Sequence, residues 1–368
     1  MWPGRSVETS EAVAAPTGTT FGIEEEFVLL DPKTLTTVDR GLAAVADLAG
    51  SVPGAVVREF FPSQIEYATP VCRTVDDALR DLGGFRTRLS AWAGAAGAVV
   101  AASGTPFATN GRDPELEGRY AVIAQDIAGL TPEHQLNGLH VHVGIPDRDT
   151  GVRASNFLRP WFPVLLALSA NSPFWRGRDT GFASWRAIHS RRWTTHGIPP
   201  HFEGAADYDR AVRFLTGVGA TSDIGTINWV ARLSATHPTL EVRVCDVPLD
   251  PYSSVALAAL IRALAAVGAD RETPHPAGYE GWDAALWHAA RHGTGATLVD
   301  PLSGRLVPSA AVLESLVAVA GPRMPDADRG LVDCFLAEHA AHGGDATQQR
   351  RAYARGRLAA LYRDRFTG

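Results

Sequence analysis

Two glutamates separated by one residue, Glu24 and Glu26, lie in the segment 20–30. The aromatic and branched residues of this segment predict a β-strand that ends at Asp31. Because side chains alternate between the two faces of a strand, Glu24 and Glu26 share one face and Glu25 lies on the other. Two carboxylates about 7 Å apart on one face raise each other's pKa unless a cation lies near them. The pair fits a metal site, and it also fits a solvated strand face.

Three further segments, 63–71, 136–145 and 239–246, repeat the alternation of apolar and polar side chains. With an adjoining strand, their polar positions supply Glu59, Glu66, His140, His142, Glu241 and Arg243. An ordinary solvated face mixes Thr, Ser, Lys, Gln and Glu, whereas so many carboxylates on one face would repel one another. Divalent cations would compensate, and carboxylate-rich sites suit Mg²⁺ or Mn²⁺. A purely structural sheet face is the alternative.

An arginine among these carboxylates, Arg243, suits a polyphosphate that bridges the metal ions. The sequence contains no G-x-x-x-x-G-K-[ST] motif and no G-x-G-x-x-G after a predicted strand. The pattern therefore predicts ATP bound through metal ions rather than through the backbone amides of a glycine-rich loop. The chemistry would be γ-phosphoryl transfer, in which metal ions and arginine neutralise developing charge.

The composition of the chain argues against several classes of function. A net charge of −6 and a pI near 6.1 argue against nucleic-acid or anionic-membrane binding. Lys33 is the sole lysine, so mechanisms that need a lysine have one poorly placed candidate. The three widely spaced cysteines form neither a disulfide framework nor a zinc motif, and we interpret them as reduced thiols of a cytoplasmic protein. The apolar runs 163–170 and 255–269 are too short or interrupted to cross a bilayer, and we expect buried helices there.

The elements that must position these residues form one predicted domain, 20–368, preceded by a disordered leader, 1–19. Hydrophobic periodicity predicts helices at 41–50, 74–97, 118–130, 156–170, 207–217, 253–268, 281–292, 309–320, 327–342 and 346–362. A hairpin is predicted at 297–307.

The motifs occur in a fixed order: GIEEE at 22–26, QIEYATP at 64–70, GLHVHVG at 138–144 and TLEVRVCD at 239–246. The ordered set resembles the bacterial carboxylate–amine ligases of the glutamate–cysteine ligase type 2 family, from about residue 20 to the C-terminus. The resemblance implies an α+β fold, a curved and mainly antiparallel sheet packed by helices, like the catalytic domains of glutamine synthetase and guanido kinases. It also implies an ADP-forming reaction. An amino-acid carboxylate, with glutamate the first candidate, takes the γ-phosphoryl group of ATP, and an amine then displaces phosphate.

The resemblance also implies roles for single residues. The expected Mg²⁺ shell, in which Mn²⁺ is an alternative ion, is Glu24, Glu26, Glu59, Glu66, His140 and Glu241. Arg243 and Glu26 are the expected catalytic residues, and Arg243 with Arg232 would bind the nucleotide. Part of the amino-acid pocket would come from Trp185, Arg186, Arg192 and Trp193, where an arginine holds the substrate's spare carboxylate. The expected partners are small amino acids and amines, without nucleic acid or membrane, and a homo-oligomer is left open.

Several alternatives stay open. The segment 228–235 and His196 depart from the pattern usual in the family, which leaves the amine undetermined. A guanido-kinase-like phosphotransferase, a non-catalytic nucleotide-binding relative and an H-x-H zinc hydrolase are competing functions. His142 is either a ligand or an orienting residue, and Cys245, expected on the face of Glu241, is either a nucleophile or a core thiol. Glu25 is interpreted as a buried ion-pair partner or a strand-edge residue.

Overall fold

One antiparallel sheet organises the fold. The computed structural model describes residues 19–112, 114, 116–222, 224–271 and 281–368. The seven strands follow the order β2-β3-β1-β5-β9-β8, and β4 pairs with β1. Their bounds are β1 (Phe21–Leu30), β2 (Ala55–Arg58), β3 (Gln64–Ala68), β4 (Val99–Ala101), β5 (Gly138–Gly144), β8 (Ala231–Leu233) and β9 (Thr239–Asp246). All pairings between these strands are antiparallel. The strand that carries the first motif therefore lies inside the sheet, with partners on both sides.

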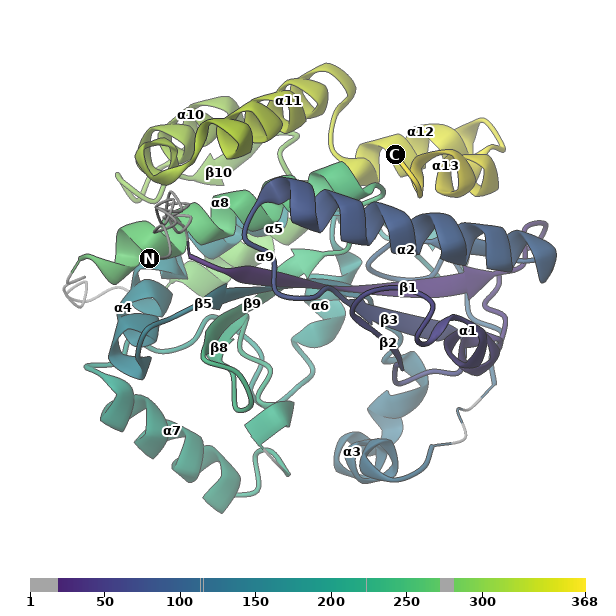
Figure 1. Cartoon of the computed structure of the whole chain (residues 1–368), viewed down its shortest axis with the longest axis horizontal. Helices are drawn as coiled ribbons and strands as arrows, with labels where there is room; N and C mark the ends of the chain where they lie inside the picture. Colours follow the sequence, from purple (N-terminus) through teal and green to yellow (C-terminus); the bar gives the residue numbers. More distant parts are fainter. Residues whose placement is uncertain (1–18, 113, 115, 223, 272–280) are drawn as a thin grey trace, which may run out of the picture.

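Helices cover one face of the sheet, and α3 (Arg119–Ile127) and α7 (Ala205–Gly217) lie on the other side (Figure 1). The face is covered by α2 (Val75–Ala95) and α8 (Pro251–Ala269), near α4 (Arg148–Leu158), α5 (Phe162–Ser169) and α9 (Trp282–His292). α10 (Ser309–Ala320) and α11 (Asp326–His342) pack on the outer side of α8, whereas α12 (Asp345–Ala354) packs on α13 (Leu358–Arg365), which contacts β4. The remaining elements are α1 (Gly41–Leu48), α6 (Trp185–Ser190) and the hairpins β6 (Phe174–Trp175)–β7 (Arg178–Asp179) and β10 (Thr297–Val299)–β11 (Leu306–Pro308).

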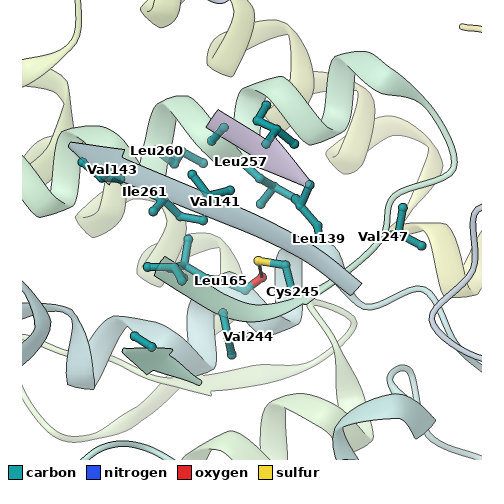
Figure 2. Packing of buried hydrophobic residues seen from close by; sticks show 14 of the residues in the cluster. Leu139, Val141, Val143, Leu165, Val244, Cys245, Val247, Leu257, Leu260 and Ile261 are labelled. Atoms are coloured by element: carbon teal, nitrogen blue, oxygen red, sulfur yellow. Dashed lines mark hydrogen bonds between the residues drawn. The ribbon is translucent and has the colours of Figure 1, made fainter. Parts of the chain in front are cut away.

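The main core lies between the sheet and α8. Figure 2 shows Leu139, Val141 and Val143 of β5 on the side of Leu257 and Leu260, and all five side chains are buried. Among the described residues, α8 is the one helix long and apolar enough to span a bilayer, and 78% of its apolar window is buried inside the protein. The run 255–269 is therefore a buried core helix, as predicted.

One charged residue of β1, Glu25, lies on the apolar side of the sheet in an ion pair. Arg86 of α2 pairs with Glu25, with Nε 2.9 Å from Oε2 and Nη2 2.6 Å from Oε1, and both side chains are fully buried. The interpretation of Glu25 as a buried ion-pair partner is confirmed. The sheet thus separates Glu25, on the core side, from Glu24 and Glu26.

Two predicted helices are wrong in their extent. The helix expected at 156–170 is two helices separated by a 3-10 turn at Arg159–Trp161 that contains Pro160, since proline removes a backbone donor and clashes with the preceding turn. Pro163 lies in the first turn of the second helix, where proline is tolerated. The first of the two helices begins earlier, at Arg148, after the N-cap Asp147, whose side chain accepts a 2.7 Å hydrogen bond from the backbone N–H of Thr150. The helix expected at 346–362 also divides, near Gly356 in the left-handed region with φ of 65°. Of the predicted leader, residues 1–18 lie outside the described part.

Candidate active site

The polar face of the sheet gathers the motif side chains through strand register. Glu26 pairs with Glu66 across β1 and β3, and Glu24 pairs with His140 across β1 and β5. His142 in turn pairs with Glu241 across β5 and β9. Because directly opposed residues share a face, four strands place these side chains side by side.

All six predicted metal ligands come together, in two groups of three. One group is Glu24, His140 and Glu241, and the other is Glu26, Glu59 and Glu66. Within each group the candidate ligand atoms lie within 4.8 Å of one another. Both groups line one cavity of about 590 Å³ on the side of the sheet away from α8. The face is therefore the floor of a cavity rather than an open solvated surface.

Burial, together with repulsion at Glu26 and Glu66, makes the charged forms of the three-carboxylate group unfavourable. Burial, followed by the charge of Glu59, raises the pKa of Glu26 to about 8. Burial also raises the pKa of Glu59, and burial with the neighbouring glutamates raises the pKa of Glu66 well above its usual value. Few donors compensate: the backbone N–H of Gly138 donates to Glu26 over 2.6 Å, and the Tyr120 hydroxyl lies 3.3 Å from Glu59. The group favours positive charge in the cavity.

The second group already contains cationic and imidazole partners. Burial alone would raise the pKa of Glu24, but hydrogen bonds from His140 and His142, both at 3.1 Å, lower the net pKa. Burial would also raise the pKa of Glu241, but the charges of Arg243 and Arg232 outweigh burial and lower the net pKa. Burial, with the charge of Arg243, lowers the pKa of His140 to about 4, so its imidazole is neutral at pH 7, the form that binds metals.

One atom of this group lacks a partner. Nε2 of His140 is buried without a hydrogen bond and lies 3.7 Å from Oε1 of Glu26. A donor set of five carboxylates and one neutral imidazole, with this nitrogen unsatisfied, fits oxygen-preferring Mg²⁺ or Mn²⁺ better than tetrahedral zinc. His142 belongs to neither group: its Nδ1 contacts Oγ1 of Thr239 at 2.9 Å and its Nε2 contacts Glu24. The structure places His142 as a residue that orients Glu24.

Arg232 and Arg243, the two arginines predicted to bind the nucleotide, differ in how many of their N–H groups already donate to described residues. Both line the cavity. Arg232 donates to Glu241 through Nε at 2.8 Å and Nη2 at 3.1 Å, and through Nη1 to the carbonyls of Gly225 and Ile227. Arg243 donates to Glu241 through Nη1, and this nitrogen also lies 3.3 Å from Nδ1 of His140. Its Nε and Nη2 make no hydrogen bond to any described residue, so Arg243 is the arginine that is available to a phosphate.

The position predicted for Cys245 is wrong. Leu139 pairs with Cys245 and Val141 pairs with Val242, so β9 contains one more residue than β5 between these pairs. This bulge turns Cys245 to the apolar side, where Figure 2 shows it beside Leu165. Burial raises the pKa of the Cys245 thiol to about 12. Cys245 is a core thiol, and the nucleophile alternative has no geometric support.

The predicted amino-acid loop is only partly at the cavity. Arg186 and Trp193 line it, whereas Trp185 and Arg192 do not. Trp185 faces Phe182, with ring centroids 5.3 Å apart. Arg192 pairs with Glu133 at 2.7 Å. The residue types of the loop suited a carboxylate pocket, but the short helix α6 presents only some of them to the cavity.

Sequence reasoning missed several residues that line the cavity. They include Tyr120 and His134, whereas Asn228 and His196 were named only as departures from the family pattern. Nε1 of Trp193 donates to His134 at 2.8 Å, and Nε2 of His196 is buried without a partner. Burial lowers the pKa of both histidines to about 3, so both are neutral. His134 and His196 lie in connecting segments without a periodic pattern, and only the departures at 228–235 and His196 pointed to this wall.

Comparison with known proteins agrees with this geometry. The family model described as glutamate–cysteine ligase family 2 matches residues 20–363. The chain belongs to this family. It is 40% identical over 349 residues to a putative glutamate–cysteine ligase 2-2 of Saccharopolyspora erythraea, covering 92% of this chain and 89% of that one. It is 39% identical to a putative glutamate–cysteine ligase 2-1 of Nocardia farcinica, covering 91% and 88%. The chain is thus a ligase of the glutamate–cysteine ligase type, a carboxylate–amine ligase.

Solved structures show the same fold. A bifunctional glutathione synthetase from Pasteurella multocida superposes with a TM-score of 0.71 at 15% identity, over 95% of this chain and 52% of that one, about half its length. A glutamate–cysteine ligase from Francisella tularensis, described in complex with AMP, gives a TM-score of 0.67 at 13% identity, over 95% and 88%. The predicted α+β fold and the predicted family are confirmed.

Proposed function

We propose that this ligase uses Mg·ATP to join an amino-acid carboxylate, with L-glutamate the first candidate, to an amine through an acyl phosphate. The observation that carries the proposal is the cavity floor, where six metal-ligand side chains from β1, β3, β5, β9 and the turn after β2 form two adjacent groups. Mg²⁺ bound there would offset the repulsion between the carboxylates and the triphosphate of ATP.

The protein's own side chains then have distinct tasks. Arg243, beside both Glu241 and Glu26, directs free N–H donors toward the charge that develops on the transferred phosphoryl group. Arg186 faces the same cavity and offers a guanidinium to the substrate's spare carboxylate. Glu24, oriented by His140 and His142, stays ionised as a ligand. None of these tasks needs a lysine or a covalent enzyme intermediate.

The part of the cavity that would bind the amine carries little charge. The wall that contains His134, Trp193 and His196 is aromatic and neutral, in contrast to the acidic floor. It suits the body of an uncharged amine nucleophile. Whether cysteine is that amine depends on this wall rather than on the metal groups.

A product analysis tests the proposal. Purified protein is incubated with Mg·ATP and single amino acids, then with pairs of amino acids and amines, and the products are identified by mass. We expect ADP, phosphate and an amide only when an acid and an amine are both present. AMP with pyrophosphate would reject the acyl phosphate, and ADP with a stable phosphorylated product would indicate a phosphotransferase. Nucleotide binding without turnover across the panel would indicate a non-catalytic relative.

A further inference from the structure

Asp246 lies outside the cavity, next to Arg186, the proposed partner of the substrate's spare carboxylate. Asp246 ends β9, is fully buried and does not line the cavity. Three hydrogen-bond donors and one guanidinium group converge on its two oxygens. The backbone N–H of Asn171 lies at 2.9 Å, the hydroxyls of Ser172 and Ser184 at 2.6 and 2.9 Å, and Nη1 of Arg186 at 3.8 Å. The three donors and the guanidinium favour the ionised carboxylate, and burial opposes it.

The two hydroxyl contacts, like the direct ion pair, connect Asp246 to Arg186. Its backbone N–H donates to the Ser172 hydroxyl over 3.0 Å, and that hydroxyl donates to Asp246. Ser184 is the N-cap of α6, the short helix that carries Arg186, and its hydroxyl accepts from Ala187 while donating to Asp246. Asp246 therefore fixes both the backbone and the guanidinium of Arg186.

The guanidinium of Arg186 has hydrogen-bond partners at Nη1 and Nη2 but not at Nε. Nη2 donates to the carbonyl of Arg243 at 3.2 Å and Nη1 lies 3.4 Å from the carbonyl of Val244, while Nε is buried without a partner. A Cβ on Gly138 would lie 2.5 Å from Nη2, so a larger residue at position 138 would displace the guanidinium from the place it has here. Burial raises the pKa of Asp246, and Arg186 is the leading charge that opposes this rise.

We infer that Asp246 is a positioning residue: it holds Arg186 at the angle at which Arg186 binds the spare carboxylate of the acid substrate. The inference rests on the proposed function, since Arg186 is the proposed carboxylate partner. Asp246 touches neither substrate nor nucleotide, and its effect reaches the reaction through Arg186 alone. A change at Asp246 therefore alters recognition of the acid and leaves the magnesium-nucleotide floor intact.

The test compares D246N with the wild type, using L-glutamate, L-cysteine and Mg·ATP as probes. We expect KM for L-glutamate to rise about 10-fold, as a misplaced binding group does, while KM for ATP and kcat stay near wild-type values. R186Q should show the same loss, and D246N with R186Q should be no worse than R186Q alone. Equal losses for L-glutamate and ATP, or additive losses in the double variant, would overturn the inference.

A matched control is available in the same fold. Asp250 is also a buried aspartate with an arginine partner, Arg365, and it caps α8 through a 2.9 Å hydrogen bond from Ser253. D250N should lower stability without a change in KM for L-glutamate. If D246N does not fold, S172A removes the link between Asp246 and the Arg186 backbone, and we expect a smaller rise in the same KM. An unchanged KM in S172A would then overturn the inference.

A crystal structure of D246N, or of S172A, separates this inference from the proposed function. We expect Arg186 to leave the carbonyls of Arg243 and Val244. An unmoved Arg186 overturns the inference whatever the activity. A wild-type protein that forms no product from L-glutamate contradicts the proposed substrate instead, and a displaced Arg186 would still support the positioning role.

Discussion

Three consecutive glutamates on β1 show how strongly position controls a carboxylate. Glu25 is fully buried against Arg86 on the core side. Glu24 receives hydrogen bonds from two histidines, and Glu26 lies among like charges with its pKa raised to about 8. The alternation of side chains along a strand predicted this division from the sequence. It could not predict Arg86, since the partner of Glu25 lies 61 residues away.

Replacement of Glu26 tests the metal floor. E26Q should fold normally, because an amide relieves repulsion, yet lose about 100-fold or more in Mg²⁺-dependent turnover. The measurement is initial rate against Mg²⁺ concentration, with thermal melting as the check on folding. E314Q, at an exposed position on α10, should behave as wild type. Wild-type turnover in E26Q would remove Glu26 from the site.

Replacement of Glu25 tests the opposite face of the same strand. E25Q leaves the Arg86 guanidinium without its counter-charge, so the free energy of unfolding should fall by about 3 kcal/mol. Urea denaturation measures this change. The Mg²⁺ concentration for half-maximal turnover should stay as in the wild type. A weakened Mg²⁺ response equal to that of E26Q would mean that the faces are wrongly assigned.

At the scale of elements, regular alternation along a strand predicted which face a side chain lies on. Irregular segments did not allow this prediction. Alternation along β3, β5 and β9 placed Glu66, His140 and Glu241 correctly. The bulge opposite His140 is set by the register of two strands, so the sequence of β9 alone gave the wrong face for Cys245. The amino-acid loop lacks a period, and residue types alone did not separate Arg186 and Trp193 from their neighbours.

The bulge makes a prediction about Cys245. C245A should keep wild-type turnover, because the thiol lies in the core and its pKa is raised to about 12. Loss of the buried sulfur should lower the free energy of unfolding by about 1 kcal/mol. Steady-state kinetics and chemical denaturation measure the two effects. Abolished turnover in a folded C245A would restore the nucleophile alternative.

At the scale of the whole molecule, helices on one face leave the other face of the sheet free to form a cavity floor (Figure 1). The helix-covered face packs apolar residues, and the opposite face concentrates charge. The family motifs lie on the strands, so the sequence predicted this arrangement. The segments that close the cavity from below come from loops, α3 and α6, which show no motif.

This arrangement predicts opposite responses of stability to metal and to mutation. In metal-free protein, E66Q should raise the melting temperature, because burial and neighbouring glutamates raise the pKa of Glu66 and make its charge costly at neutral pH. Mg²⁺ with ATP should stabilise the wild type, by about 2.7 kcal/mol at a hundred times Kd, and stabilise E66Q less. Thermal shift assays with and without EDTA measure both effects. A metal-free E66Q that melts below wild type would contradict the repulsion argument.

The most direct test of the acidic floor is a count of bound metal. Mn²⁺ binding, followed by electron paramagnetic resonance in the presence of a non-hydrolysable ATP analogue, reports the stoichiometry for each chain. The two groups of ligands predict at least two Mn²⁺ ions in the wild type. E66Q and E241Q, one from each group, should each lose Mn²⁺ binding. Nucleotide that binds equally well in EDTA, with no Mn²⁺ retained, would contradict the account.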